Sequence, residues 1–260
     1  MAKAVKLLKF SAIILLLAGL IAYVLFAMTA LAKPDPEERC QGMELAFNDA
    51  AAVNFIDAKE VEAMLKSRGL YPKGKLMCEV DTRSIEQVIR QNVFVEDVEC
   101  YKTSGGNLRI QIEQRTPVIY IIPDGKDGYY IDKDGKVIPS SVYTSNMVVA
   151  TGYIPKNFAA TELADFGSFL QADKFWDAQI EQIYLLKGKD GKPLVEIIPR
   201  VGNHVVYLGT IDGYEKKLRR LKIFYEKAMG TVGWNKYDRI NLEYNNQIIC
   251  TKSRKRHSGN

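Results

Sequence analysis

An uncharged apolar stretch of 23 residues, Phe10–Ala32, constrains this chain more than any other feature of its sequence. With a rise of about 1.5 Å per residue, a helix of this length exceeds the roughly 30 Å hydrocarbon core of a bilayer. Its end, Ala30-Leu31-Ala32, also resembles a signal-peptide cleavage site. However, the apolar regions of signal peptides run only about 7–15 residues. We therefore expect an uncleaved transmembrane helix over residues 10–32.

The charges beside this stretch predict its orientation. Lysines at positions 3, 6 and 9 precede it, and acidic residues at positions 35, 37 and 38 follow. The positive-inside rule then leaves residues 1–9 in the cytoplasm and carries everything after residue 32 across the membrane. Residues 33–40, which include Lys33-Pro34-Asp35-Pro36, are expected to form a stiff, solvated linker.

The overall charge argues against nucleic acid as a partner. The chain has 36 basic and 31 acidic residues, but seven of the basic residues lie in the two ends, at positions 3, 6, 9, 252, 254, 255 and 256. The remainder therefore has 29 basic against 31 acidic residues and is close to neutral. A nucleic-acid-binding fold would be expected to show a basic stripe on its own surface.

The four cysteines are Cys40, Cys78, Cys100 and Cys250. No two of them form a C-x-x-C pair, so the sequence predicts neither a zinc site nor a thioredoxin-like motif. A disulfide is possible outside the cytoplasm, and four small buried hydrophobic residues are an equally good interpretation. The spacing gives no connectivity.

Residues 41–116 have the pattern of a small α+β module. Alternation over Met43–Phe47 predicts a half-buried strand. Asp57, with a glutamate three residues later, and then Asp81 are expected to cap two helices. Two further strands, around residues 98–100 and 108–112, are separated by a glycine-rich turn. The predicted order is strand, helix, helix, strand, strand.

Residues 117–251 are rich in short strands and tight turns. Asp134-Gly135 and Asp190-Gly191 are typical of hairpin turns, because glycine supplies the positive φ angle that such turns need. The last two strands are predicted at residues 239–244 and 247–251, followed by a disordered basic tail over residues 252–260. We expect a mainly antiparallel β domain.

Two helices are predicted within this β domain. The first covers residues 161–171, with an apolar face at Leu163, Phe166 and Leu170. The second is expected to begin at Asp212, which forms a capping box with the glutamate three residues later, and to end at Gly230.

The sequence shows no catalytic constellation. His257 lies in the tail and His204 is interpreted as a turn or edge residue. The Asp132-x-Asp134-Gly135 stretch lacks the further ligands and the bidentate glutamate of a calcium loop. Motifs of serine hydrolases, phosphate-binding loops, zinc peptidases and dinucleotide-binding folds are missing. We therefore predict a binding protein rather than an enzyme, with no metal, cofactor or small-molecule substrate.

Taken together, these segments resemble the FtsQ/DivIB family of bacterial cell-division proteins over essentially the whole chain. The pieces that carry the resemblance are Asn92–Val95, Leu108–Ile112 with Gln114–Val118, Tyr129–Asp132 with Gly135 and Pro139, Val149–Gly152, Pro199–Gly202, Lys217-Leu218, and Asn241-Leu242-x-Tyr244. Gly233–Tyr237 and Asn246–Cys250 are similar to the Bacteroidetes-type branch. The resemblance implies that residues 41–116 form a POTRA domain and residues 117–251 the FtsQ-type β domain.

The resemblance also implies a function. It predicts a non-enzymatic, single-pass scaffold of the division septum in the inner membrane, with its bulk in the periplasm. Its partners would be FtsB/FtsL-like bitopic proteins, and it would help to control septal peptidoglycan synthesis. Glu243 departs from the family pattern, since many relatives have a basic residue there beside the tyrosine. A membrane-anchored POTRA component of protein export or envelope assembly is the alternative, although no repeated POTRA unit is found.

The partner site is predicted on the terminal strand and the turn before it. Its consecutive apolar residues, with charge only from Lys252 onward, are typical of a sheet edge open to β-augmentation. A buried position inside the sheet is the alternative. The candidate partner-binding residues are Tyr244, Gln247, Ile248, Ile249, Cys250 and Thr251.

Overall fold

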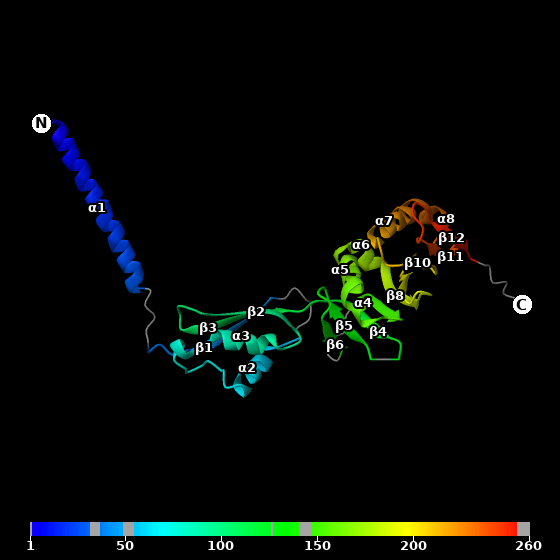
Figure 1. Ribbon diagram of the computed structural model, residues 1–260, viewed down its shortest axis with the longest axis horizontal. Helices are drawn as coiled ribbons and strands as arrows, with labels where there is room; N and C mark the ends of the chain where they lie inside the picture. The colour runs from blue at the N-terminus through cyan, green and yellow to red at the C-terminus, as the bar shows by residue number, and fades with distance from the viewer. Residues whose placement is uncertain (1, 32–36, 49–54, 126, 141–146, 254–260) are drawn as a thin grey trace, which may run out of the picture.

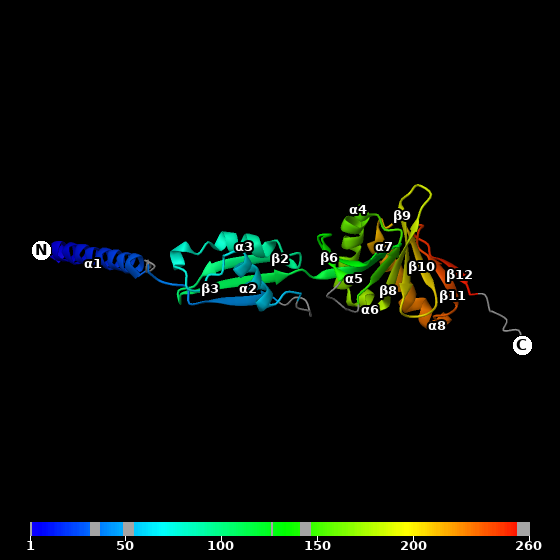
Figure 2. The same ribbon diagram turned by 90° about the horizontal axis from the view of Figure 1, so that it is seen from below.

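The computed structural model describes residues 2–31, 37–48, 55–125, 127–140 and 147–253. In this part of the chain a long N-terminal helix is followed by two domains that lie one after the other along the long axis (Figures 1 and 2). We call residues 37–114 the first domain and residues 117–253 the second domain. The predicted tail was expected to begin at Lys252, but Lys252 belongs to the last strand, and from position 254 onward the tail lies outside the described residues.

Helix α1 (Ala2–Leu31) contains the apolar stretch, and its side chains from Ile13 to Phe26 are exposed. A search restricted to the described residues finds no helix that is long and apolar enough to cross a membrane. The membrane span therefore stays a prediction.

The first domain has the predicted order of elements. Its elements are β1 (Gly42–Asn48), α2 (Ala58–Ser67), the 3-10 turn η1 (Met77–Glu79), α3 (Thr82–Arg90), β2 (Val95–Lys102) and β3 (Asn107–Gln114). The sheet order is β1-β3-β2, with β1 parallel and β2 antiparallel to the central strand β3. Leu108, Ile110 and Ile112 of β3 are fully buried because this strand has a neighbour on each side and a helical layer over one face.

Both predicted helix caps of this domain are confirmed. The Asp57 side chain accepts a hydrogen bond from the Glu60 amide at 2.8 Å, and Asp81 accepts from the amides of Arg83 and Ser84. These bonds satisfy amides that have no partner inside a helix. The predicted starts of α2 and α3 are therefore correct.

The second domain is built on one mixed nine-stranded sheet in the order β12-β11-β10-β9-β8-β7-β4-β5-β6. The strands are β4 (Pro117–Pro123), β5 (Tyr129–Asp132), β6 (Val137–Pro139), β7 (Val149–Gly152), β8 (Ile180–Lys187), β9 (Pro193–Pro199), β10 (Val205–Gly209), β11 (Tyr237–Asn241) and β12 (Ile249–Lys252). Antiparallel pairs predominate, and parallel pairs join β4 to β7, β7 to β8 and β10 to β11. The α+β class is thus confirmed.

The helices of the second domain cover this sheet and differ in extent from the prediction. The first helical run comprises α4 (Lys156–Phe158), the π-helical turn η3 (Ala159–Leu163) and α5 (Ala164–Ala172). It therefore begins five residues before the predicted start. Leu163, Phe166 and Leu170 are buried, as expected. A short helix, α6 (Lys174–Gln179), was not predicted.

The second helical run comprises α7 (Tyr214–Phe224), η4 (Tyr225–Met229) and α8 (Gly230–Val232). The prediction that Asp212 caps it is wrong. The residue at the N-cap is Gly213, with φ 65°, and it provides no side-chain hydrogen bond. Gly230 does not end the run either, because it is helical and the chain leaves the helix at Gly233, with φ 89°.

The interpretation of His204 as a turn or edge residue is also wrong. Its side chain is only 1% exposed, and its Nε2 atom lies 2.6 Å from the Tyr225 hydroxyl. Tyr225 in turn packs edge-on against Trp234. His204 is thus a core residue between the start of β10 and the helical run above it.

Candidate functional site: the edge strand and its flanking helix

Strand β12 lies at one edge of the nine-stranded sheet, and among the described residues it pairs only with β11. It runs from Ile249 to Lys252, so Gln247 and Ile248 precede it and Tyr244 belongs to the turn between the two strands. The structure therefore brings the six predicted residues together on one edge. The alternative of a central strand does not hold.

The side chains of this segment alternate between the core and the solvent. Ile248 and Cys250 pack against the main hydrophobic core. Ile249 is 45% exposed and Tyr244 is 51% exposed. Burial raises the pKa of the Cys250 thiol, so this cysteine is protonated near neutral pH and is a poor nucleophile. The segment is therefore suited to contact rather than to chemistry.

The backbone of β12 offers hydrogen bonds along its free edge. The Ser253 amide donates to the Lys236 carbonyl on the β11 side at 3.0 Å. Successive residues of a strand direct their backbone groups to opposite sides, so Ile249 and Thr251 also face β11. Cys250 and Lys252 then direct their backbone groups away from the sheet, toward a strand that could be added.

Arg220 of α7 holds the turn that leads into this strand. Its Nη1 atom donates to the carbonyls of Tyr244 at 2.7 Å and Gln247 at 3.2 Å, and its Nη2 atom donates to the Leu242 carbonyl at 2.8 Å. A planar guanidinium can serve several carbonyls at once, which the single ammonium of lysine does less well. Arg220 thus fixes the position of the edge relative to the helix.

A groove of about 360 Å³ lies between the helix and the segment before β12. Its apolar walls come from Phe224 and Ala228 on one side and Ile248 on the other. Ile223, which is 47% exposed, and the basic Lys227 also line it. A strand added to β12 would therefore have an apolar groove beside it, in which a neighbouring part of the same partner could pack.

The part of the site that α7 contributes was not predicted from the sequence. Arg220 lies 22 to 27 residues from the carbonyls that it binds, so no local pattern reveals the contact. The one signal was Ile223, an apolar residue among the basic residues on the solvent side of α7. Such an exposed apolar residue beside an edge strand is a reason to suspect a binding surface.

The β2 edge of the first domain differs, because side chains of α3 cover it. The Cys100 amide of β2 donates to Glu86 at 2.8 Å, and Arg90 donates to the Val98 carbonyl at 3.1 Å while pairing with Asp97. These side chains take the places that a partner strand would need. Of these two edge strands, β12 is therefore the better candidate for strand addition.

A metal centre is not evident. Across the described ranges no group of three or more His, Cys, Asp or Glu side chains could hold a metal ion. The buried Cys100 has its pKa raised to about 12, chiefly by burial, so it too is a protonated core thiol. What the geometry of the second domain offers is a strand edge with an adjacent groove.

Fold and site together define a two-domain protein whose second domain has an edge strand with an apolar groove beside it. Two family models match the chain. The model "FtsQ/DivIB, C-terminal related" matches residues 116–251, which is just over half of the chain. The model for a POTRA-like domain matches residues 38–113. The chain therefore belongs to the FtsQ/DivIB family, and this membership implies a cell-division scaffold.

Solved structures were also compared. One similar structure is the major extracytoplasmic domain of the trans isomer of the bacterial cell-division protein DivIB from Geobacillus stearothermophilus. The sequence identity is 16%, the TM-score is 0.34, and the alignment covers 46% of this chain and 98% of that chain. No curated protein matches the chain.

Proposed function

We propose that this protein is a non-enzymatic scaffold of the division septum that binds an FtsB/FtsL-like bitopic partner through the edge of β12. Residues 10–32 anchor it in the inner membrane, residues 1–9 remain in the cytoplasm, and both domains lie in the periplasm. By holding its partner there, the scaffold helps to control septal peptidoglycan synthesis. Membership of the FtsQ/DivIB family supports this assignment.

The observation that carries the proposal is the free edge of β12. A partner segment in extended conformation would pair with the backbone groups of Cys250 and Lys252, and its side chains would contact Ile249 and Tyr244, which are exposed. Main-chain pairing supplies affinity with little dependence on sequence, and the groove beside the strand supplies specificity. The proposed partner is therefore a segment with an extended stretch next to an apolar side chain that fills the groove.

A proline substitution at the outward-facing position 252 tests this directly. Proline lacks the N–H that the partner strand would need, whereas alanine keeps it. We expect Lys252→Pro to abolish binding of the extracytoplasmic segment of the cognate FtsB-like protein, measured by isothermal titration calorimetry. Lys252→Ala should retain binding, apart from a small loss from the missing charge.

The matched variant is Thr251→Pro, because the Thr251 amide faces β11. It should lower the melting temperature of the protein, which Lys252→Pro should leave unchanged. If Lys252→Pro binds the partner segment as tightly as Lys252→Ala does, pairing along this edge is ruled out.

A further inference from the structure

The two domains are joined by only two residues, Arg115 and Thr116, between the end of β3 and the start of β4. Two covalently linked domains move relative to each other by default unless their interface restrains them. The contacts around this joint therefore determine whether the two domains can move relative to each other.

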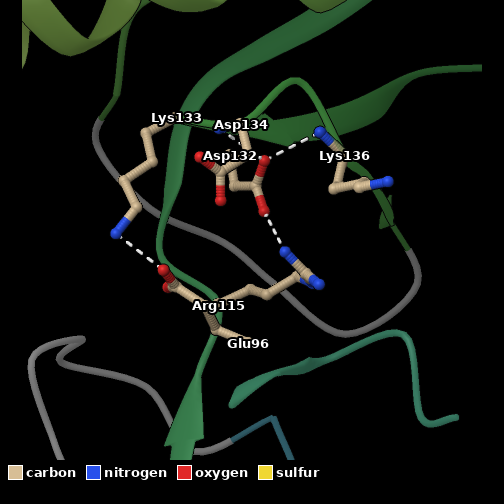
Figure 3. Close-up of polar contacts among 6 residues, drawn as sticks. All are labelled: Glu96, Arg115, Asp132, Lys133, Asp134 and Lys136. Atoms are coloured by element: carbon tan, nitrogen blue, oxygen red, sulfur yellow. Dashed lines mark hydrogen bonds and ion pairs between the residues drawn. The ribbon is translucent and has the colours of Figure 1, made fainter. Parts of the chain in front are cut away.

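Arg115 forms the central contact of the joint. Its Nη1 atom lies 2.6 Å from Oδ2 of Asp132, at the end of β5 in the second domain, and Asp132 is 1% exposed (Figure 3). The other carboxylate oxygen accepts hydrogen bonds from the amides of Asp134 at 3.0 Å and Lys136 at 2.7 Å. The Arg115 amide donates to the Phe94 carbonyl of the first domain at 2.9 Å. Arg115 thus binds both domains at once.

Gln114 restrains the same joint from the side of the first domain. Its side chain is 3% exposed, and its Oε1 atom accepts hydrogen bonds from the amides of Phe55 at 2.7 Å and Ile56 at 3.3 Å. Phe55 stacks on Phe94 with ring centroids 5.4 Å apart. The last residue of β3 is therefore fixed to the loop before α2.

An apolar cluster crosses the joint as well. Buried Phe55 of the first domain lies in one cluster with Tyr130 and Ile138 of the second domain. Lys133 and Glu96 form a further ion pair at 2.6 Å across the two domains (Figure 3). The Lys133 side chain is 58% exposed, and ion pairs at the surface contribute little free energy of stabilisation. The buried Arg115–Asp132 pair and the cluster are thus the contacts that restrain the joint.

We propose that Arg115 and Asp132 lock this joint, so that the two domains move as one rigid body and β12 stays at a fixed distance and orientation from the first domain. Removing one member of a buried ion pair is costly, because it leaves the other charge uncompensated. The joint therefore opens only if several groups lose their partners together. The rigidity itself does not depend on the identity of the partner at β12.

Distance measurements within the full chain in detergent test this. Spin labels attached to ketone-bearing amino acids at the exposed positions 68 and 189 report one distance between the domains and leave all four cysteines unlabelled. We expect a narrow distribution for the unmodified joint. With Arg115→Ala, we expect the distribution to become roughly twofold broader, as for domains linked without a lock.

A second variant distinguishes the loss of the ion pair from a loss of the folded structure. Arg115→Leu combined with Asp132→Asn removes the buried charge, while the asparagine oxygen can still accept from the amides of Asp134 and Lys136. It should broaden the distribution equally and keep the native circular dichroism spectrum. Arg90→Ala is the control, since it breaks an ion pair of 2.7 Å within the first domain alone and should leave the distribution narrow. A broad distribution in the unmodified joint, or a narrow one in both Arg115 variants, would overturn the proposal.

Discussion

His204 shows how one buried side chain can make stability depend on pH. Burial lowers its pKa, and the Trp234 carbonyl opposes this only in part. In the neutral form Nε2 can accept a hydrogen bond from the Tyr225 hydroxyl, the group that lies 2.6 Å away. Protonation makes Nε2 a donor, so the hydroxyl would have to turn its own hydrogen into the apolar core. The folded protein therefore disfavours the charged imidazole.

The direction of the pH effect follows from this lowered pKa. Below a pH of about 6.5 the unfolded chain takes up a proton that folded His204 resists, so stability is lost as the pH falls. We expect the free energy of unfolding to decrease between pH 6.5 and 5 by at most about 1.4 kcal/mol per pH unit from this residue. Both tryptophans, Trp176 and Trp234, lie in the second domain, so urea unfolding followed by tryptophan fluorescence measures this domain.

The control for this prediction is His204→Gln, which cannot titrate. Between pH 6.5 and 5, the free energy of unfolding of this variant should decrease less than that of the unmodified protein. The other histidine, His257, is present in both proteins and cancels in the comparison. Equal slopes in the two proteins would show that His204 is not the group responsible.

Two aspartates that look alike in sequence differ in what they do at helix starts. Asp57 accepts a hydrogen bond from a helix amide, whereas Asp212 is exposed and precedes a glycine N-cap. We expect Asp57→Ala to cost about 0.5–2 kcal/mol of stability, as for other lost caps. Asp212→Ala should change stability by less than about 0.5 kcal/mol, as for most surface positions. Thermal unfolding followed by circular dichroism gives both values, and the reverse order would contradict the assignment of the caps.

At the scale of the element, Arg220 of α7 holds the turn that leads into β12. Arg220→Ala should release the turn before β12 and lower stability by about 1.5–3 kcal/mol, the range for hydrogen bonds to a charged group. It should also weaken partner binding, because the edge is no longer held in place.

Arg219→Ala is the matched control on the same helix, since the Arg219 side chain is exposed. It should alter stability by less than about 0.5 kcal/mol. Urea unfolding and calorimetry on the two variants separate the roles. If Arg220→Ala and Arg219→Ala change stability and partner binding equally, the three carbonyl contacts of Arg220 contribute to neither.

The elements that sequence reasoning predicted are those with local signals. Gly135, with φ 72°, and Gly191, with φ 81°, occupy the hairpin turns that their Asp-Gly pairs indicated. The terminal strand was expected at residues 247–251 from its apolar run and is found at Ile249–Lys252. Each of these features depends on residues within a few positions of one another.

The features that were missed depend on distant contacts. Strand β10 begins one residue after His204, whose packing partner Tyr225 lies 21 residues away. The start of α7 depends on Gly213 adopting a positive φ angle, which a pattern of acidic residues does not reveal. Arg220 is one of several basic residues of α7, and only the fold places three carbonyls around it.

At the scale of the whole molecule, one interior strand of each sheet carries the connection between the two domains. β3 is the middle strand of the first sheet, and after Arg115 and Thr116 the chain enters β4 inside the second sheet. The two sheets are thus connected through interior strands rather than through edges. Neither sheet gives up an edge to the connection, which leaves β12 free at the far side of the second domain (Figure 1).

The strand order of the second sheet also has a consequence for how the protein is made. Outward from β4, strands β5 and β6 add to one side, and β7 to β12 then add to the other side in the order of the chain. Each new strand therefore pairs with one that precedes it in the chain and has already been synthesised. The edge of β12 is completed last, after β11 and the helix that carries Arg220. A partner that pairs with this edge, as we propose, would therefore engage only molecules in which β11, β12 and this helix have already folded.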